Sequence, residues 1–87
     1  MMWFVYILGC ADNSVYVGET SDLDLRLVKH NEGSACAFTV ARRPVTLACS
    51  QTHATHERAL KREQQIKRWT RAKKEALIAR DLTLKHL

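Results

Sequence analysis

The chain has 87 residues, 46% of them hydrophobic and 26% charged, with a formal net charge of +5. This length suffices for one domain, so we expect a single domain over residues 1–87. The composition excludes a disordered chain, and no apolar run is long enough to cross a bilayer.

The three cysteines, Cys10, Cys36 and Cys49, favour a reducing environment. Their number is odd and none of them forms a CxxC pair, whereas a secreted disulfide framework normally has an even number. A lipoprotein-like Gly9-Cys10 follows the first apolar run, but no basic residue precedes Arg26, so the positive segment of a signal peptide is absent. We therefore expect free thiols and a cytoplasmic protein.

Two β-favouring runs, residues 3–8 and 15–17, begin the chain. Asp12 and Asn13 between them tolerate left-handed backbone, which favours a hairpin turn. The first run is apolar throughout, so we expect it to be covered on both faces.

The chain's two tyrosines, Tyr6 and Tyr16, lie on these two strands. Side chains alternate along a strand, so the length of the hairpin loop decides whether the two rings share a face. A three-residue loop at 11–13 would place Tyr6 opposite Gly18 on a shared face, and a two-residue loop would place the rings on opposite faces. In the first case Gly18, which has no side chain, would leave space beside the Tyr6 ring for a ligand.

A helix is predicted from Ser21, whose side chain would cap the amide of Asp24, to about Asn31. Gly33 is a typical residue just past a helix end.

Arg26 and His30 are four residues apart and therefore share one face of this helix. One interpretation is a solvated arginine with a histidine that favours the negative end of the helix dipole. The other is a phosphate clamp, in which the planar guanidinium binds phosphate oxygens and the imidazole handles a proton near neutral pH.

Residues 33–44 are expected to form a loop with Arg42 and Arg43 at its basic tip. Pro44 restricts the residue before it to extended geometry, and a third strand is predicted over residues 45–49.

Thr55 is a plausible cap for a helix that continues to about Trp69. Thr70 would cap a last helix over residues 71–82, with alanines along one face. The resulting order, β-β-α-β-α-α, predicts an α/β (α+β) fold in which helices flank a three-stranded, mainly antiparallel sheet. Residues 57–80 hold nine Lys or Arg against three Glu, and this basic region suggests a polyanionic partner, nucleic acid first of all.

Glu63 falls within the apolar stripe of the helix that begins at Thr55, near Ala59 and Ile66. A carboxylate that faces a core is costly unless a cation meets it. One interpretation is an edge position where Glu63 pairs with Lys67, four residues on. The other is a metal ligand, because magnesium takes few protein carboxylates and keeps several waters.

The ordered set of motifs resembles the GIY-YIG nuclease domains, specifically small stand-alone bacterial proteins that contain little more than the domain. The residues that carry the likeness are FVY at 4–6, YVG at 16–18, Thr20, DLDLRLVKHN, RRPV and ALKREQQIKRW…KKEALI, over almost the whole length. Phe4 stands where the family has its first Gly, and Val5 and Val17 stand where it has Ile.

The resemblance implies the β-β-α-β-α-α fold and an endonuclease that hydrolyses DNA phosphodiester bonds with Mg²⁺ or Mn²⁺. Tyr6 and Tyr16 would flank the scissile phosphate, Arg26 would bind it, and Glu63 would hold one divalent metal. Tyr6 is the favoured base for the attacking water, with His30 or Lys67 as a proton relay.

Backbone phosphates would be bound without sequence readout by cations of the loop and of the last helices. These are Arg42, Arg43, Lys67, Arg68, Arg71, Lys73 and Lys74. DNA is the expected partner, with RNA left open, and a role in DNA repair or processing is inferred only by analogy. Two rival interpretations are a nucleic-acid-binding module with little turnover and a protein-interaction domain with an acidic partner.

Overall fold

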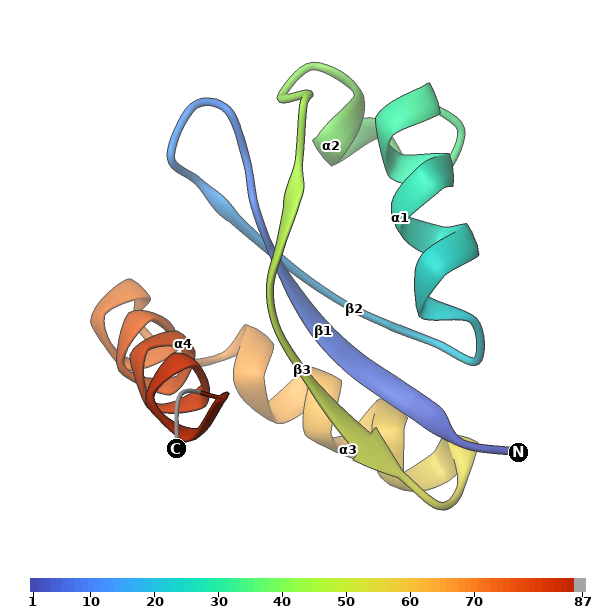
Figure 1. The fold of residues 1–87 in the computed structure, drawn as a ribbon, viewed down its shortest axis with the longest axis vertical. Coiled ribbons are helices and arrows are strands. Elements are labelled where there is room, and N and C mark those ends of the chain that lie inside the picture. Colours follow the sequence, from blue (N-terminus) through green and yellow to red (C-terminus); the bar gives the residue numbers. More distant parts are fainter. Residues whose placement is uncertain (86–87) are drawn as a thin grey trace.

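A computed structural model describes residues 1–85 of the chain, with side chains as far as residue 80 (Figure 1). The strands are β1 (Trp3–Gly9), β2 (Val15–Thr20) and β3 (Thr46–His53). The helices are α1 (Leu23–Glu32), α2 (Ala37–Val40), α3 (His56–Lys67) and α4 (Arg71–Lys85). The predicted α+β order is confirmed, with the short helix α2 added between α1 and β3.

The hairpin between β1 and β2 has the three-residue loop. The amide of Cys10 donates to the carbonyl of Ser14 at 2.9 Å, and Asn13 takes a left-handed conformation with φ of 68°. In this register Tyr6 lies opposite Gly18, so Tyr6 and Tyr16 share one face of the sheet.

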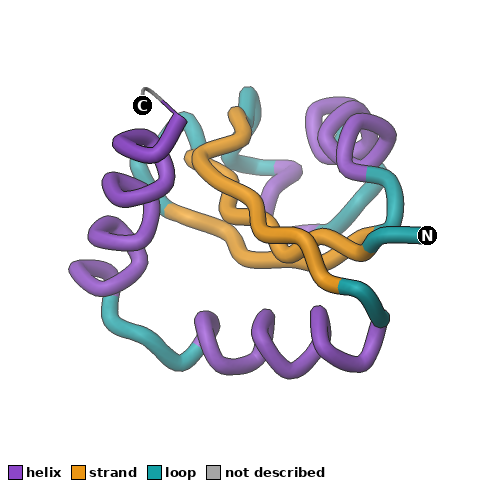
Figure 2. Tube along the Cα trace, turned by 60° about the horizontal axis from the view of Figure 1, so that its bottom comes forward, coloured by secondary structure: helices purple, strands orange, loops and turns teal. Residues whose placement is uncertain are grey.

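The sheet has the order β2-β1-β3, and both strand pairs are antiparallel. The central strand β1 is covered on both faces, as its uniform apolarity predicts. Helices α1 and α2 lie on one side of the sheet and α3 and α4 on the other, and Figure 2 shows the strands between them.

Each face of the sheet has its own core. The α3/α4 face buries the apolar set Val5, Ile7, Val17, Cys49, Ala59 and Ile66. The α1/α2 face buries Tyr6, Leu8, Cys10 and Val45, with Leu23, Leu27, Leu47 and Tyr16 partly buried against them.

The residues that cap the helices are those predicted, with one exception. Asp22, and not Ser21, caps α1: its Oδ1 accepts from the amide of Leu25 at 3.1 Å. Both residues are good caps, and local sequence does not decide between neighbours. Gly33 ends α1 with φ of 87°, and Thr55 caps α3, as predicted.

Two further expectations are wrong in detail. The segment 33–44 is not loop throughout, because α2 occupies Ala37–Val40; a four-residue helix is too short to show a periodic pattern. Strand β3 extends to His53 rather than to residue 49, since its partner β1 offers bonding groups along its whole length.

In α4 the alanines do not face the sheet. Leu77 and Ile78 pack against the core, whereas Ala72, Ala76 and Ala79 are exposed. Across residues 1–85, no helix is both long enough and apolar enough to cross a membrane.

Candidate active site

Tyr6 and Tyr16 meet on the α1/α2 face of the sheet. Their ring centroids are 6.4 Å apart, with an angle of 44° between the planes. Gly18 leaves no room for a ligand, contrary to expectation, because the Tyr6 ring itself fills that space. A Cβ on Gly18 would lie 2.5 Å from Tyr6 Cζ and 3.1 Å from Tyr16 Cε2, so this position must be glycine for the two rings to pack.

His30 lies beneath both rings. Its Nε2 is 2.9 Å from Tyr6 Oη, and its ring meets that of Tyr16 edge-on at 5.2 Å between centroids. On its other side, Nδ1 is 2.8 Å from Thr39 Oγ1. His30 lies in the last turn of α1, as predicted, and is only 1% exposed, because its ring nitrogens face Tyr6 and Thr39.

Arg26 lies one helical turn before His30, and its charge affects the pKa of the Tyr6 phenol. Burial raises the pKa of Tyr6 to about 12, while the charge of Arg26 and a hydrogen bond from its side chain work in the opposite direction. Burial, and then the charge of Arg26, lowers the pKa of His30. At neutral pH the cluster therefore holds a neutral phenol, a neutral imidazole and one guanidinium cation.

Residues in and around α2 pack against Tyr16. Burial, followed by a hydrogen bond to the Cys36 side chain, raises the pKa of Tyr16 above its usual range. The Phe38 ring stacks on Tyr16 at 5.8 Å, and Arg42 covers Phe38 at 4.0 Å. Sequence reasoning missed Cys36, Phe38 and Thr39, because a segment interpreted as loop gives no indication of where its side chains point.

Glu63 and Lys67 on α3 lie near Tyr16 of β2. Lys67 Nζ is 3.2 Å from Glu63 Oε1 and 6.0 Å from the centre of the Tyr16 ring. The charge of Glu63 also contributes, after burial and Cys36, to the raised pKa of Tyr16. The predicted pairing of Glu63 with Lys67 is confirmed, and the pair lies near Tyr16.

A hydrated hard cation fits the carboxylate of Glu63. Its side chain is 14% exposed, and it carries a negative charge beside a cluster of neutral phenols. Among residues 1–80, whose side chains the structure describes, no group of three or more His, Cys, Asp or Glu could hold a metal ion. A magnesium ion needs only one or two carboxylates and completes its shell with water and phosphate oxygens.

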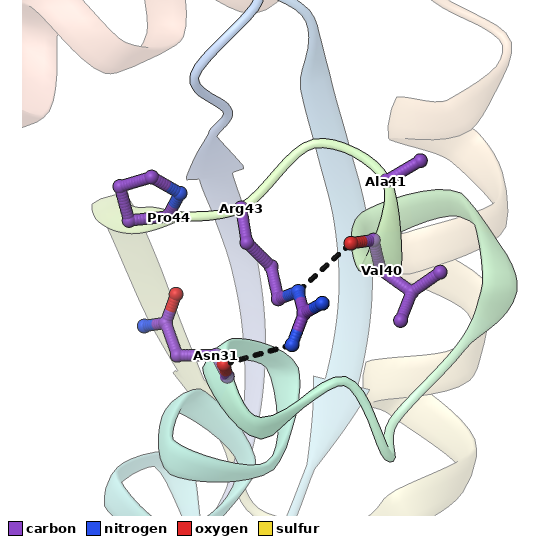
Figure 3. A pocket seen from close by; sticks show the side chains of 5 residues that line it. All are labelled: Asn31, Val40, Ala41, Arg43 and Pro44. Atoms are coloured by element: carbon purple, nitrogen blue, oxygen red, sulfur yellow. Dashed lines mark hydrogen bonds between the residues drawn. The ribbon is translucent and has the colours of Figure 1, made fainter.

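The two loop arginines are held by local contacts. Arg42 Nε is 3.1 Å from Asp12 Oδ2. Figure 3 shows Arg43 at a cavity of about 440 Å³, where its Nε donates to the Val40 carbonyl at 2.8 Å and its Nη1 to the Asn31 carbonyl at 3.4 Å. Arg43 thus ties the end of α1 to the loop before β3.

The basic residues of α3 and α4 surround Trp69. Arg62 and Lys73 lie over its ring, at 4.9 and 4.5 Å from the centre. Arg68 lines a second cavity together with Trp69, while Arg71 pairs with Glu75 at 2.9 Å. A cavity of about 210 Å³ beside this ring is lined by Arg62, Trp69, Lys73, Ala76, Leu77 and Arg80.

A family model agrees with this geometry: residues 2–76 match the GIY-YIG catalytic domain. The chain belongs to the GIY-YIG family. The resemblance inferred from the motifs is thereby confirmed, and the domain is of a nuclease family.

Other members of the GIY-YIG family are close in sequence. A UPF0213 protein of Staphylococcus epidermidis is 45% identical over 75 residues, which cover 86% of this chain and 92% of the relative. A UPF0213 protein of Staphylococcus aureus is 47% identical with the same coverage.

Two solved structures share the fold. The solution NMR structure of the UPF0213 protein BH0048 from Bacillus halodurans has 38% identity and a TM-score of 0.59. That of the protein EF2693 from E. faecalis has 31% identity and a TM-score of 0.62. Each alignment covers 91% of this chain and 84% of the solved chain.

Proposed function

We propose that the protein is a metal-dependent endonuclease that hydrolyses DNA phosphodiester bonds and serves in DNA repair or processing. The observation that carries the proposal is the convergence of Tyr6, Tyr16, Arg26 and His30 on one face of the sheet, with the Glu63–Lys67 pair at its edge. Phenols and an imidazole can move protons, and the guanidinium can bind a phosphate through its paired donors.

In the proposed reaction, a water held by the cluster attacks phosphorus and gives its proton to the Tyr6 oxygen. Tyr6 is 1% exposed, so this water has to be an ordered molecule at the mouth of the cluster. A phenol with a pKa of about 12 is a poor base at neutral pH unless its own proton is taken as the water approaches. His30 Nε2, 2.9 Å away, is the acceptor within reach.

The cations of the cluster act on the phosphate. Arg26 stabilises the charge that develops on the phosphoryl oxygens in the transition state. Tyr16 is more exposed than Tyr6 and orients the phosphate from the other side. Lys67 lies near enough to the Tyr16 ring to add positive charge there.

Glu63 is the residue that would hold a Mg²⁺ or Mn²⁺ ion. Such an ion supplies positive charge that stabilises the departing 3′ oxygen. Lys67, 3.2 Å from Glu63 Oε1, orients the carboxylate before the ion binds.

The DNA backbone would lie across the basic surface of α3 and α4. Arg62, Lys73 and Arg80 line one cavity together with the Trp69 ring, and among residues 1–80, whose side chains the structure describes, no acidic side chain lines it. Bringing three cations together without an anion costs energy, so a phosphate is the natural occupant. This surface binds backbone rather than base sequence, and binding should weaken steeply as salt rises.

The test compares two glutamates of α3 that make the same kind of ion pair. Glu63 pairs with Lys67, and the exposed Glu57 pairs with Lys61 at 3.4 Å. Wild type, Glu63→Gln and Glu57→Gln are incubated with branched, single-stranded and duplex DNA, each with Mg²⁺, Mn²⁺ or EDTA. We expect Glu63→Gln to lower the cleavage rate about 100- to 1000-fold, the loss typical of one electrostatic contact at a reacting centre, and Glu57→Gln to leave it unchanged.

Binding of the same DNAs is measured alongside cleavage. If wild type binds but cleaves none of them with any metal, the protein is a binding module and the proposal is wrong. Equal cleavage by Glu63→Gln and wild type would assign the activity to a contaminant.

A further inference from the structure

A chain of buried polar groups runs from β1 through α1 into α2. Tyr6 Oη is 2.9 Å from His30 Nε2, His30 Nδ1 is 2.8 Å from Thr39 Oγ1, and Thr39 Oγ1 is 3.4 Å from the carbonyl oxygen of Cys36. Tyr6, His30 and Thr39 are 1%, 1% and 0% exposed. Buried polar groups cost free energy unless each of them is hydrogen-bonded, so the contacts in this chain constrain one another.

The direction of the bonds follows from Cys36. A carbonyl oxygen can only accept, so the Thr39 hydroxyl donates its one hydrogen to the Cys36 carbonyl oxygen at 3.4 Å. Thr39 Oγ1 is then the acceptor in its contact with His30 Nδ1, so Nδ1 carries a hydrogen.

This tautomer also fixes the contact with Tyr6. A neutral imidazole with its hydrogen on Nδ1 has none on Nε2, so the phenolic hydrogen of Tyr6 donates to Nε2 at 2.9 Å. The Sγ of Cys36 is also 3.4 Å from Thr39 Oγ1. The network, rather than an observed hydrogen, assigns the tautomer.

We propose that Thr39 is a positioning residue that holds His30 as the Nδ1–H tautomer, so that Nε2 is free to take the phenolic proton of Tyr6. The proposal rests on the proposed nuclease function for its catalytic meaning, although the tautomer itself can be measured without any activity. Thr39 lies on α2, and its role gives this short helix a purpose beyond connecting α1 to β3.

The proton steps balance. As the water attacks phosphorus, one of its O–H bonds breaks and a new O–H bond forms on Tyr6, while the original phenolic proton moves to His30 Nε2. The imidazolium then donates from both nitrogens, to the Tyr6 oxygen and to Thr39 Oγ1, so neither N–H is left unpaired. It later loses one proton to solvent, and the departing 3′ oxygen gains one.

The surroundings of His30 require a neutral partner at Nδ1. The polar and titratable groups that face it come from β1, β2, its own helix and the α2 segment: Tyr6, Tyr16, Arg26, Thr39 and Cys36. Because burial, and then the charge of Arg26, disfavours the imidazolium, a hydroxyl at Nδ1 orients the ring without holding a permanent positive charge on it. A carboxylate at this position would instead keep His30 protonated and block it as an acceptor.

The test records the imidazole ¹⁵N resonances of His30 in the full chain without metal or DNA. Wild type and Thr39→Ser, which keeps the hydroxyl, should both show the Nδ1–H tautomer. Thr39→Val, which has nearly the same shape without the hydroxyl, should show a mixture of tautomers. An Nε2–H tautomer in wild type, or an unchanged Nδ1–H tautomer in Thr39→Val, would overturn the proposal.

The effect of Thr39 on activity is tested by single-turnover cleavage across pH. We expect Thr39→Val to lower the cleavage rate about 10- to 100-fold at saturating DNA. This loss is part of the loss expected when a general base is removed. Its pH profile should shift relative to wild type, and Thr39→Ser should restore both within about threefold. Thr52→Val, at an exposed β3 threonine, serves as the control.

The NMR and cleavage experiments together distinguish failure of the positioning role of Thr39 from failure of the nuclease function. If wild type shows the Nδ1–H tautomer but no cleavage, the nuclease function fails and the positioning role of Thr39 stands. If wild type cleaves and Thr39→Val cleaves with the same rate and pH profile, the positioning role fails and the nuclease function stands.

Discussion

The two faces of strand β1 carry different kinds of side chain. Val5 and Ile7 point into an entirely apolar core under α3 and α4, whereas Tyr6 points to a histidine and a threonine that are buried under α1 and α2. Apolar burial stabilises the fold at about 25 cal/mol per Å², but buried polar groups at best offset their own desolvation. One face therefore provides stability, and the other uses part of that stability to hold reactive groups in place.

The largest expected loss of stability lies on the apolar face. Ile66 is 1% exposed and central to that core, so Ile66→Ala should lower the free energy of unfolding by about 2–5 kcal/mol. Denaturant unfolding measures the loss, and cleavage per folded molecule should stay near the wild-type value at a temperature where the variant is folded. A variant that keeps its stability would show that this face is not the main source of it.

The polar face should make stability depend on pH. Burial lowers the pKa of His30 below the usual histidine value of about 6.5, so below about pH 6.5 the unfolded chain binds a proton that the folded chain does not. Stability should fall as pH drops from 6.5 toward the lowered pKa, by at most about 1.4 kcal/mol per pH unit.

The pH effect is measured by denaturant unfolding between pH 7.5 and 5.5, with His30→Gln as the comparison. The free energy of unfolding of the variant should depend less on pH than that of wild type, because glutamine has no titrating group. Equal slopes in the two proteins would mean that His30 is not held neutral by the fold.

The smallest effect is expected on the outer surface of α3 and α4. Lys73 lies over the Trp69 ring in the basic cavity, so Lys73→Ala should weaken DNA binding a fewfold for all sequences alike and lower the salt slope by about 1. The cleavage rate at saturating DNA should not change. A loss that depends on base sequence would contradict a backbone-binding surface.

Much of the fold could be predicted because local signals were strong. Gly33 and Thr55 mark helix ends through their own backbone and side-chain chemistry, and the length of the turn at Asp12-Asn13 sets which faces the tyrosines take. Helix α2 escaped prediction because four residues cannot show a periodic pattern.

The candidate site could be predicted only in part. Tyr6, Arg26 and His30 were found from spacing and family likeness. Thr39 was not found, because its role comes from a 2.8 Å contact with a residue nine positions earlier. The space expected beside Gly18 was also wrong, since alternation along strands fixes which side chains face each other but not which ring fills a gap.

The central claim is that residues from both sides of the sheet act on one phosphate, and a double-mutant cycle tests it most directly. Single-turnover cleavage is measured for wild type, Tyr6→Phe, Glu63→Gln and the double variant at saturating DNA and Mg²⁺. If Tyr6 and Glu63 act as a unit, the double variant should be about as slow as the slower single variant. If the rate reductions of the two single variants multiply in the double variant, the two residues act independently, and this result would contradict the account.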